Sequence, residues 1–296
     1  MKTCEEQLET LISLAISDQA HDIHIQCNEP VVSVAFRGLL GLKEVTCVKL
    51  TPAFIEFCKF KANCDSSIYS IPQTGRFEML INKKLVLIRF SIIETYHAKS
   101  VALRILNGVA ISQFSRLTND SSAIENLQRL SSITSGLVLF SGATGSGKTT
   151  TMLTYLKNLQ NKRIYTLEDP IEQLHSQFMQ LQINEERGLT YSNGLAHLLR
   201  HDPDVIVLGE IRSEHEAKVA ISAAYTGHLV CCSIHSSSAF LTLGRMMDLN
   251  TSTYDLLSVT KAIVYQQLKV CKHKKTRSAF YEILDQNQIK DLLLSA

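Results

Sequence analysis

A glycine-rich segment, GATGSGKT at residues 142–149, restricts the fold of this chain more than any other feature. It matches the phosphate-binding template GxxxxGK(S/T), which has meaning where a buried strand precedes it and a helix follows. The apolar run GLVLF at residues 136–140 predicts the strand. Beyond the segment, apolar residues recur with helical spacing at Met152, Tyr155, Leu156 and Leu159. An incidental glycine-rich turn would not have this context, so we expect an α/β domain.

This segment predicts a site for a nucleoside triphosphate. Its glycines allow successive backbone N–H groups to point at phosphates, and the positive end of the following helix adds its field. Lys148 is expected to reach the β- and γ-phosphates, and Thr149 to hold Mg²⁺. The predicted phosphate-binding residues are Gly142, Ala143, Thr144, Gly145, Ser146, Gly147, Lys148, Thr149 and Thr150.

Length and composition indicate a globular protein with two domains, because 296 residues with 45% hydrophobic content can build ample core. No apolar run approaches the roughly 20 residues of a membrane span, and the acidic N-terminal region differs from a signal peptide, so we expect a cytosolic protein. The net charge of +2 does not favour nucleic acid as a partner. A basic stretch is interpreted as solvated surface; its residues are Lys269, Lys272, Lys274, Lys275 and Arg277. The eight cysteines include no CxxC pair and are expected to be thiols.

The two halves of the chain differ in pattern. Residues 1–110 combine helical spacing, at Leu8, Leu11, Ile12 and Ala15 and again from Pro52 to about Lys61, with alternating strand-like segments, which predicts a small α+β domain. We place a linker at residues 111–122 because this stretch is polar. In residues 123–296 helices alternate with short apolar runs, which predicts a mostly parallel sheet flanked by helices. The expected strands cover residues 137–140, 163–167, 178–183, 205–208 and 229–234.

Polar residues follow three of these predicted strands, at the edge where open α/β sheets bind ligands. Glu168 ends one strand, and Glu210 ends another in a pattern typical of a Walker B carboxylate that reaches Mg²⁺ directly or through water. His228 and His235 bracket a third strand, and an imidazole at a strand end can contact the γ-phosphate. A purely structural role remains the alternative for each histidine.

Four segments in the second half are specific in order and spacing: GATGSGKTTT at 142–151, TLEDPIE at 166–172, DPDVIVLGEIR at 202–212 and TGHLVCCSIHSSSA at 226–239. In the first half, HDIHI at 21–25, QTGRF at 73–77 and VALRIL at 101–106 extend the match. Together these segments resemble the secretion/pilus assembly ATPase superfamily, the motors of type II secretion, type IV pili and competence pili. The short chain looks most like the competence-pilus ATPases of Gram-positive bacteria.

The resemblance implies a RecA-like P-loop ATPase domain preceded by a small PAS-like domain, with ATP and Mg²⁺ as cofactors. It assigns Glu168 and Glu210 to positioning Mg²⁺ and the attacking water, and leaves open which of them polarises the water. It also implies that Arg76, Arg89 and Arg104 reach the nucleotide pocket, where guanidinium groups suit the charge of a transferring phosphoryl group. The alternative is that these arginines pair with carboxylates of their own domain.

The resemblance further implies a homo-oligomeric ring, expected to be a hexamer, that acts on an inner-membrane platform protein and lies peripherally on the cytoplasmic face. Assembly of a pilus or pseudopilus is the expected function. A retraction motor and a nucleotide-gated scaffold with weak turnover are the alternatives, the second because Ser236 and Ser237 stand where the family usually has Thr-Asn. Many relatives carry four cysteines that bind zinc near the C-terminus. Only Cys271, close to His273, remains here, so we expect no zinc site.

Overall fold

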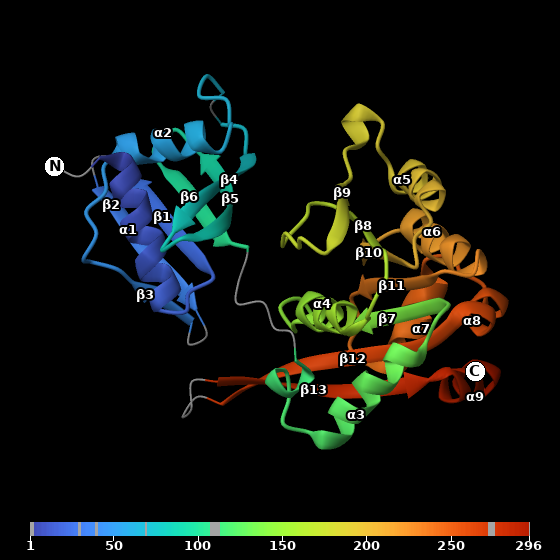
Figure 1. The fold of residues 1–296 in the computed structure, drawn as a ribbon. Coiled ribbons are helices and arrows are strands. Elements are labelled where there is room, and N and C mark those ends of the chain that lie inside the picture. The colour runs from blue at the N-terminus through green and yellow to red at the C-terminus, as the bar shows by residue number, and fades with distance from the viewer. Residues whose placement is uncertain are drawn as a thin grey trace. The chain divides into compact units, whose positions relative to one another are not determined.

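A computed structural model describes residues 3–28, 31–38, 41–68, 70–106, 113–271 and 276–295, without the side chains of 270, 271, 276, 277 and 295. The chain divides into two compact units, Met1–Val109 (unit 1) and Ala110–Ala296 (unit 2), and each is described by itself (Figure 1). The predicted linker at residues 111–122 lies partly outside the described residues. Its described part contains a 3₁₀-helix, Phe114–Arg116, and the first residues of a helix that Asp120 caps.

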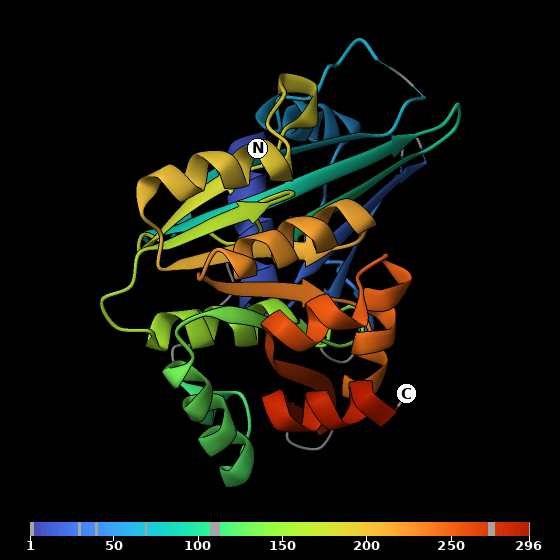
Figure 2. The ribbon, with the colours of Figure 1, turned by 90° about the vertical axis from the view of Figure 1, so that its right-hand side faces the viewer.

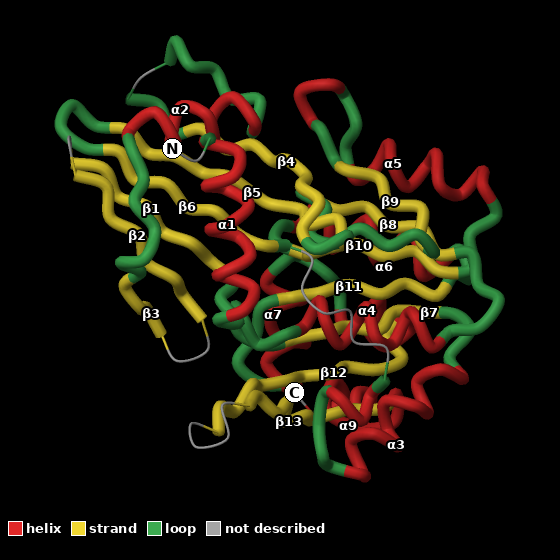
Figure 3. Tube along the Cα trace, turned by 60° about the vertical axis from the view of Figure 1, so that its left-hand side comes forward, coloured by secondary structure: helices red, strands yellow, loops and turns green. Residues whose placement is uncertain are grey.

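Unit 1 is an antiparallel sheet covered by two helices. Its elements are α1 (Cys4–Ser17), β1 (Asp22–Asn28), β2 (Val31–Gly38), β3 (Gly41–Glu44), α2 (Pro52–Lys61), β4 (Gln73–Ile81), β5 (Lys84–Glu94) and β6 (Lys99–Ile105). In the described part of unit 1 the strands form a sheet in the order β3-β2-β1-β6-β5-β4, with every neighbouring pair antiparallel. Figure 3 shows α1 lying along this sheet.

The core of unit 1 forms where both helices meet one face of the sheet. Thr3 and Glu6 close a capping box at the start of α1, which satisfies backbone N–H groups that would otherwise lack partners. The four apolar residues that predict α1 are all buried in the core. Strand residues alternate between this core and the opposite face, as the period of two in a β-strand requires.

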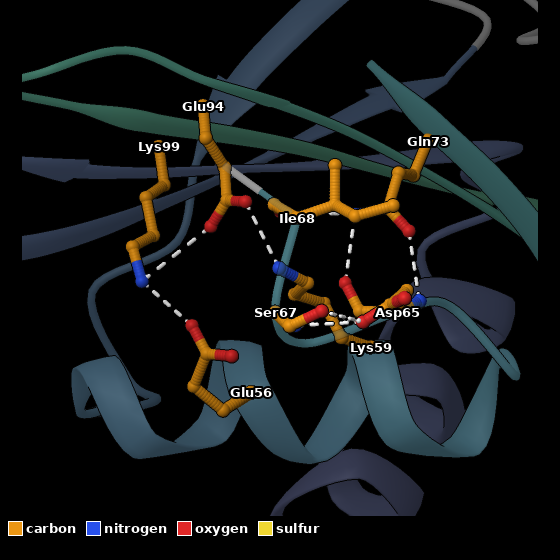
Figure 4. Close-up of polar contacts among 8 residues, drawn as sticks. All are labelled: Glu56, Lys59, Asp65, Ser67, Ile68, Gln73, Glu94 and Lys99. Atoms are coloured by element: carbon orange, nitrogen blue, oxygen red, sulfur yellow. Dashed lines mark hydrogen bonds and ion pairs between the residues drawn. The ribbon is translucent and has the colours of Figure 1, made fainter. Parts of the chain in front are cut away.

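A buried ion pair fixes α2 to the turn between β5 and β6 (Figure 4). The Lys59 Nζ lies 2.9 Å from Glu94 Oε2, and both side chains are almost fully buried. Lys99 Nζ lies 3.5 Å from the other oxygen of Glu94 and 2.6 Å from Glu56. The network therefore neutralises Glu94 from two sides, as a buried charge requires.

Unit 2 is a sheet with helices on both faces. Its elements are α3 (Ser121–Arg129), β7 (Gly136–Ser141), α4 (Lys148–Asn158), β8 (Ile164–Glu168), β9 (Phe178–Gln182), α5 (Tyr191–Leu198), β10 (Val205–Ile211), α6 (Glu214–Tyr225), β11 (Leu229–Ile234), α7 (Ala239–Asp248), α8 (Thr253–Val259), β12 (Thr260–Cys271), β13 (Thr276–Asp285) and α9 (Gln286–Ser295). Short 3₁₀-helices cover Leu130–Ser132, Glu185–Arg187 and Leu199–His201.

The sheet of unit 2 has the order β13-β12-β7-β11-β10-β8-β9 in the described residues. All neighbouring pairs are parallel except β12 with β13, so the predicted α/β fold with a mostly parallel sheet is confirmed. One face packs against α3 and α4, and the other against α5 to α9 (Figure 2). The long β12–β13 hairpin is absent from the sequence prediction, whose last expected strand covers residues 229–234.

Some of the residues singled out in the sequence lie outside the part of the chain that the structure describes. Lys272, His273, Lys274 and Lys275 lie outside them, as do the side chains of Cys271 and Arg277. Among the cysteines that are described, Cys27, Cys58, Cys231 and Cys232 are buried thiols. None of the described helices combines the length and the apolar character that crossing a bilayer requires.

Candidate nucleotide site

The glycine-rich segment forms the loop between β7 and α4, at the carboxyl edge of the sheet. Gly142 has φ +146°, and a Cβ there would lie 2.4 Å from the carbonyl oxygen of Gln266. Gly147 caps α4 in the left-handed region with φ +89°. Only glycine meets both conditions without strain, so the sequence pattern and the loop conformation have the same physical cause. Ala143, Thr144 and Gly145 are the exposed part of this loop.

Lys148 lies in the first turn of α4 and folds back over the loop. Its Nζ donates to the carbonyl oxygens of Gly142 at 2.9 Å and Ala143 at 3.2 Å, and it lies 3.2 Å from Nδ1 of His235. Burial lowers the pKa of Lys148, and the nearby carboxylates of Glu210 and Glu172 oppose this shift. The ammonium group is thus held where it can exchange loop carbonyls for phosphate oxygens.

Glu210 is placed by an irregularity in β10. The pairing of β10 with β11 shifts between Leu208 and Ile211, which inserts one extra residue and changes the direction of the side chains there. The Glu210 carboxylate lies 2.7 Å from His235 Nε2 through Oε1 and accepts from Arg212 Nε through Oε2, also at 2.7 Å. The structure therefore brings Glu210 and His235 together, as the sequence predicts.

The contacts of His235 define its tautomer. An ammonium group can only donate, so Nδ1 of His235 accepts from Lys148. The proton of a neutral imidazole then lies on Nε2 and is donated to Glu210. Lys148, His235 and Glu210 form a continuous chain of hydrogen bonds from the loop to β10.

Glu168 ends β8, which lies beside β10 in the sheet. Its Oε1 accepts hydrogen bonds from Thr166 Oγ1 at 2.6 Å and Gln180 Nε2 at 2.9 Å. Burial raises the pKa of Glu168, and these hydrogen bonds oppose the rise only in part. A carboxylate with a raised pKa is a better proton acceptor than an exposed one.

The remaining residues of the loop and of the first turn of α4 differ in burial. Ser146 is buried, whereas Thr149 and Thr150 are half-buried in the first turn of α4. The Thr149 hydroxyl and the Glu210 carboxylate are hard oxygen donors of the kind that Mg²⁺ prefers. The side chain of Glu210 is 20% exposed, so it is within reach of solvent.

The structure does not bring His228 to this site. His228 precedes β11, and its carbonyl oxygen accepts from the amide of Gly136 at the start of β7. Its Nδ1 contacts the hydroxyl of Thr226. Strand β11 separates His228 from His235, and at about 3.3 Å per residue the two lie roughly 20 Å apart at opposite ends of this strand. These contacts of His228 do not include the loop, and its role as a nucleotide contact stays a prediction.

The three predicted arginines of unit 1 form one row across its sheet. Arg76 pairs with Arg89 between β4 and β5, and Arg89 pairs with Arg104 between β5 and β6. The row continues through Asp22 on β1 to Arg37 on β2. Directly paired residues of antiparallel strands point to the same face, so these side chains share the face opposite the core.

The members of this row differ in their partners. Arg104 donates to both oxygens of Asp22, at 2.6 and 3.2 Å. Among the described residues, no ion pair joins Arg76 or Arg89 to a carboxylate. Like charges directly opposite each other repel. Two adjacent guanidinium groups without an ion-paired carboxylate are therefore suited to bind an anion.

Other residues of the site carry no signal that would reveal them. Arg212 stands in the Walker B segment without a predicted role, and Gln180 lies in a strand with no recognisable motif. Both hold a predicted carboxylate, which is apparent only from the three-dimensional arrangement.

Comparisons with known proteins agree with the motifs. The family described as Type II/IV secretion system protein matches residues 1–293. Competence protein ComGA of Halalkalibacterium halodurans is 33% identical over 315 aligned positions, which cover 99% of this chain and 90% of that protein. Competence protein ComGA of Bacillus subtilis is 34% identical, and the match covers 90% of this chain and 77% of that protein.

Among solved structures, the pilus retraction motor PilT with bound ADP is similar to this chain, with a TM-score of 0.74 and 26% sequence identity. The match covers 97% of this chain and 87% of the PilT chain. The resemblance inferred from the motifs is thereby confirmed. This chain belongs to the family of Type II/IV secretion system proteins.

Proposed function

We propose that this protein is a motor ATPase that hydrolyses ATP to drive assembly of a competence pilus or a related secretion pseudopilus. The observation that carries the proposal is the linked set Lys148, His235 and Glu210 at the end of the phosphate-binding loop. Similarity to ComGA proteins over most of the chain supports the biological role. The similarity to PilT, solved with ADP, supports nucleotide binding.

In the proposed site the loop from Gly142 to Thr150 surrounds the phosphates, and Lys148 leaves its two loop carbonyls to bind phosphate oxygens. Thr149 and Glu210 would hold Mg²⁺, Glu210 directly or through water. When bound, Mg²⁺ neutralises phosphate charge and favours departure of the leaving group. His235 would then lose Lys148 as a partner and face the γ-phosphate.

We assign polarisation of the attacking water to Glu168. We assign binding of Mg²⁺, directly or through water, to Glu210. Both oxygens of Glu210 are already engaged by His235 and Arg212, so its carboxylate is less available to bind an attacking water. Glu168 has a pKa raised by burial and an oxygen fixed by Thr166 and Gln180. A general base works best with a pKa closer to the working pH, which favours Glu168.

The finer features of the fold and assembly belong to the same proposal. We assign unit 2 to a RecA-like ATPase domain from residue 123 and unit 1, up to residue 110, to a PAS-like domain. Arg76 and Arg89, with Arg104 beside them, would reach the phosphates of a neighbouring subunit in a hexameric ring. The adjacent guanidinium groups of Arg76 and Arg89, which have no ion pair among the described residues, support this role. Hydrolysis would then shift one subunit against the next.

The proposed setting is the cytoplasmic face of the membrane, where the ring contacts a platform protein of the pilus or secretion machine. No direct nucleic-acid partner is proposed, because the net charge is only +2. A retraction motor is the second candidate, since PilT is described as one and shares 26% identity. Nothing in hydrolysis chemistry distinguishes the two directions. A nucleotide-gated scaffold is the third candidate, suggested by Ser236 and Ser237.

Two measurements test these candidates. Steady-state ATP hydrolysis, with Glu210→Gln as the inactive reference, separates a motor from a scaffold: turnover no higher than that of the variant would support the scaffold. Deletion of the gene followed by electron microscopy of surface pili separates the directions. Loss of pili indicates assembly, whereas excess pili would indicate retraction and contradict the proposal.

A further inference from the structure

We propose that Gln266 on β12 and Tyr281 on β13 clamp the junction between the phosphate-binding loop and α4, on either side of Lys148, and are positioning residues of the nucleotide site. This inference rests on the proposed function, because it assigns a role in ATP binding to a hairpin that contains none of the predicted site residues. The clamp is visible only in the fold, since more than 100 residues separate the hairpin from the loop.

Gln266 holds the end of the loop that leads into α4. Strand β12 pairs with β7 up to Tyr265 opposite Ser141 and then continues past the end of β7, beside the loop. There the Nε2 of Gln266 donates to the carbonyl oxygen of Ser146 at 2.5 Å, and the side chain is 1% exposed. A Cβ on Gly147 would lie 3.1 Å from the same Nε2, so the amide packs directly against the residue before Lys148.

Tyr281 holds the first turn of α4. Its hydroxyl lies 2.9 Å from Oγ1 of Thr151, in the first turn of α4. Tyr281 is the direct cross-strand partner of Gln266, so both side chains leave the hairpin on the same face. Their two contacts, at Ser146 and at Thr151, lie on either side of Lys148.

This arrangement addresses a physical problem of the loop. Glycines give the loop its conformation but also many alternatives, and each alternative that ATP must suppress weakens binding. Fixed hydrogen bonds on both sides of Lys148 remove such alternatives before the nucleotide arrives. Oε1 of Gln266 and Oγ of Ser146 are buried and have no hydrogen-bond partner among the described residues. They remain available for a small rearrangement of the loop when phosphate binds.

The test uses two variants and a matched control in the full chain. Tyr281→Phe removes only a hydroxyl, and Gln266→Leu removes the amide with little change in volume. Gln267→Leu is the control, because Gln267 is exposed on the opposite face of the same strand and bonds to Tyr265 instead. ADP affinity is measured by calorimetry well below the melting temperature, with the KM and kcat of ATP hydrolysis alongside.

Each hydrogen bond that is lost should raise the Kd for ADP and the KM for ATP by about 3- to 10-fold. The kcat should change much less, because the loop holds phosphates in the ground state and the transition state alike. Gln267→Leu should match the parent. The proposal is overturned if both variants bind ADP as the parent does, even with a lower melting temperature, or if Gln267→Leu weakens binding equally.

Lys148→Ala separates this inference from the proposed function. If Lys148→Ala abolishes ADP binding while Tyr281→Phe and Gln266→Leu leave it intact, only the clamp is refuted. If Lys148→Ala also binds ADP like the parent, the nucleotide site itself is wrong.

Discussion

The assignment of Glu168 as the base that polarises water leads to a specific prediction for Glu168→Gln. The amide keeps an oxygen that can accept from Thr166 and Gln180, so the local hydrogen bonds survive the change. It cannot take a proton from water. The variant should therefore bind nucleotide normally and fail in hydrolysis.

The expected loss follows from the role of a general base. Such a group contributes about 10²–10⁴-fold to the rate, which corresponds to about 3–5 kcal/mol of activation free energy. Stability should not fall with it. Burial raises the pKa of Glu168, so the folded protein binds this proton more tightly than the unfolded chain, and ionisation at neutral pH is unfavourable for folding. A neutral amide avoids that cost, and the melting temperature should stay equal or rise.

The assay is the pH dependence of kcat/KM between pH 5 and 9, with Glu210→Gln measured beside it. In the parent, activity should decline on acidification at a higher pH than an ordinary glutamate would give, because the pKa of Glu168 is raised. In Glu168→Gln the residual activity should lack this acid limb. A variant that retains a third or more of the parent kcat, or keeps the limb unchanged, would refute the assignment and favour Glu210.

Three further predictions concern charge. Burial lowers the pKa of Lys148, so this side chain loses its charge at a lower pH than an ordinary lysine does. The affinity for ADP should therefore decline as the pH is raised from 7 to 10, and a constant affinity over this range would contradict the prediction. Arg89→Ala should lower kcat about 10²–10³-fold. Mixing it with Lys148→Ala subunits should restore part of the activity if the arginine acts across an interface, and no recovery would argue against shared sites. Lys59→Met should destabilise unit 1 by about 3–5 kcal/mol by leaving Glu94 short of a buried partner. Lys43→Met is the control, because Lys43 pairs with Asp18 on the surface, and its loss should lower the free energy of unfolding by less than about 1 kcal/mol. Equal melting temperatures of Lys59→Met and Lys43→Met would contradict this prediction.

The sequence predicted those site residues whose type is required by the backbone conformation or whose position is at the end of a predicted strand. Gly142 and Gly147 are required by backbone conformation, and Lys148 follows them at a fixed spacing. Glu210 and His235 end neighbouring strands of a parallel sheet, so the order of the strands places them side by side. Such residues can be found without coordinates because the fold leaves few places for them.

Other features depended on contacts that no local pattern encodes. His228 and His235 bracket one strand in the sequence, but their partners, Thr226 for His228 and Lys148 with Glu210 for His235, are apparent only in the structure. No motif in the sequence marks the β12–β13 hairpin, because β12 joins the sheet by pairing with β7, more than 100 residues earlier in the chain. The pairing of Arg76, Arg89 and Arg104 in one row required the register of β4, β5 and β6.

The central claim is that ATP binds at the carboxyl edge of the unit 2 sheet through Lys148 and its loop. Its most direct test is nucleotide binding and hydrolysis by Lys148→Ala, after its melting temperature is shown to match that of the parent. We expect no measurable turnover and a Kd for ATP at least 100-fold higher, since Lys148 provides the charge that meets the phosphates. Binding and turnover equal to those of the parent would contradict the account.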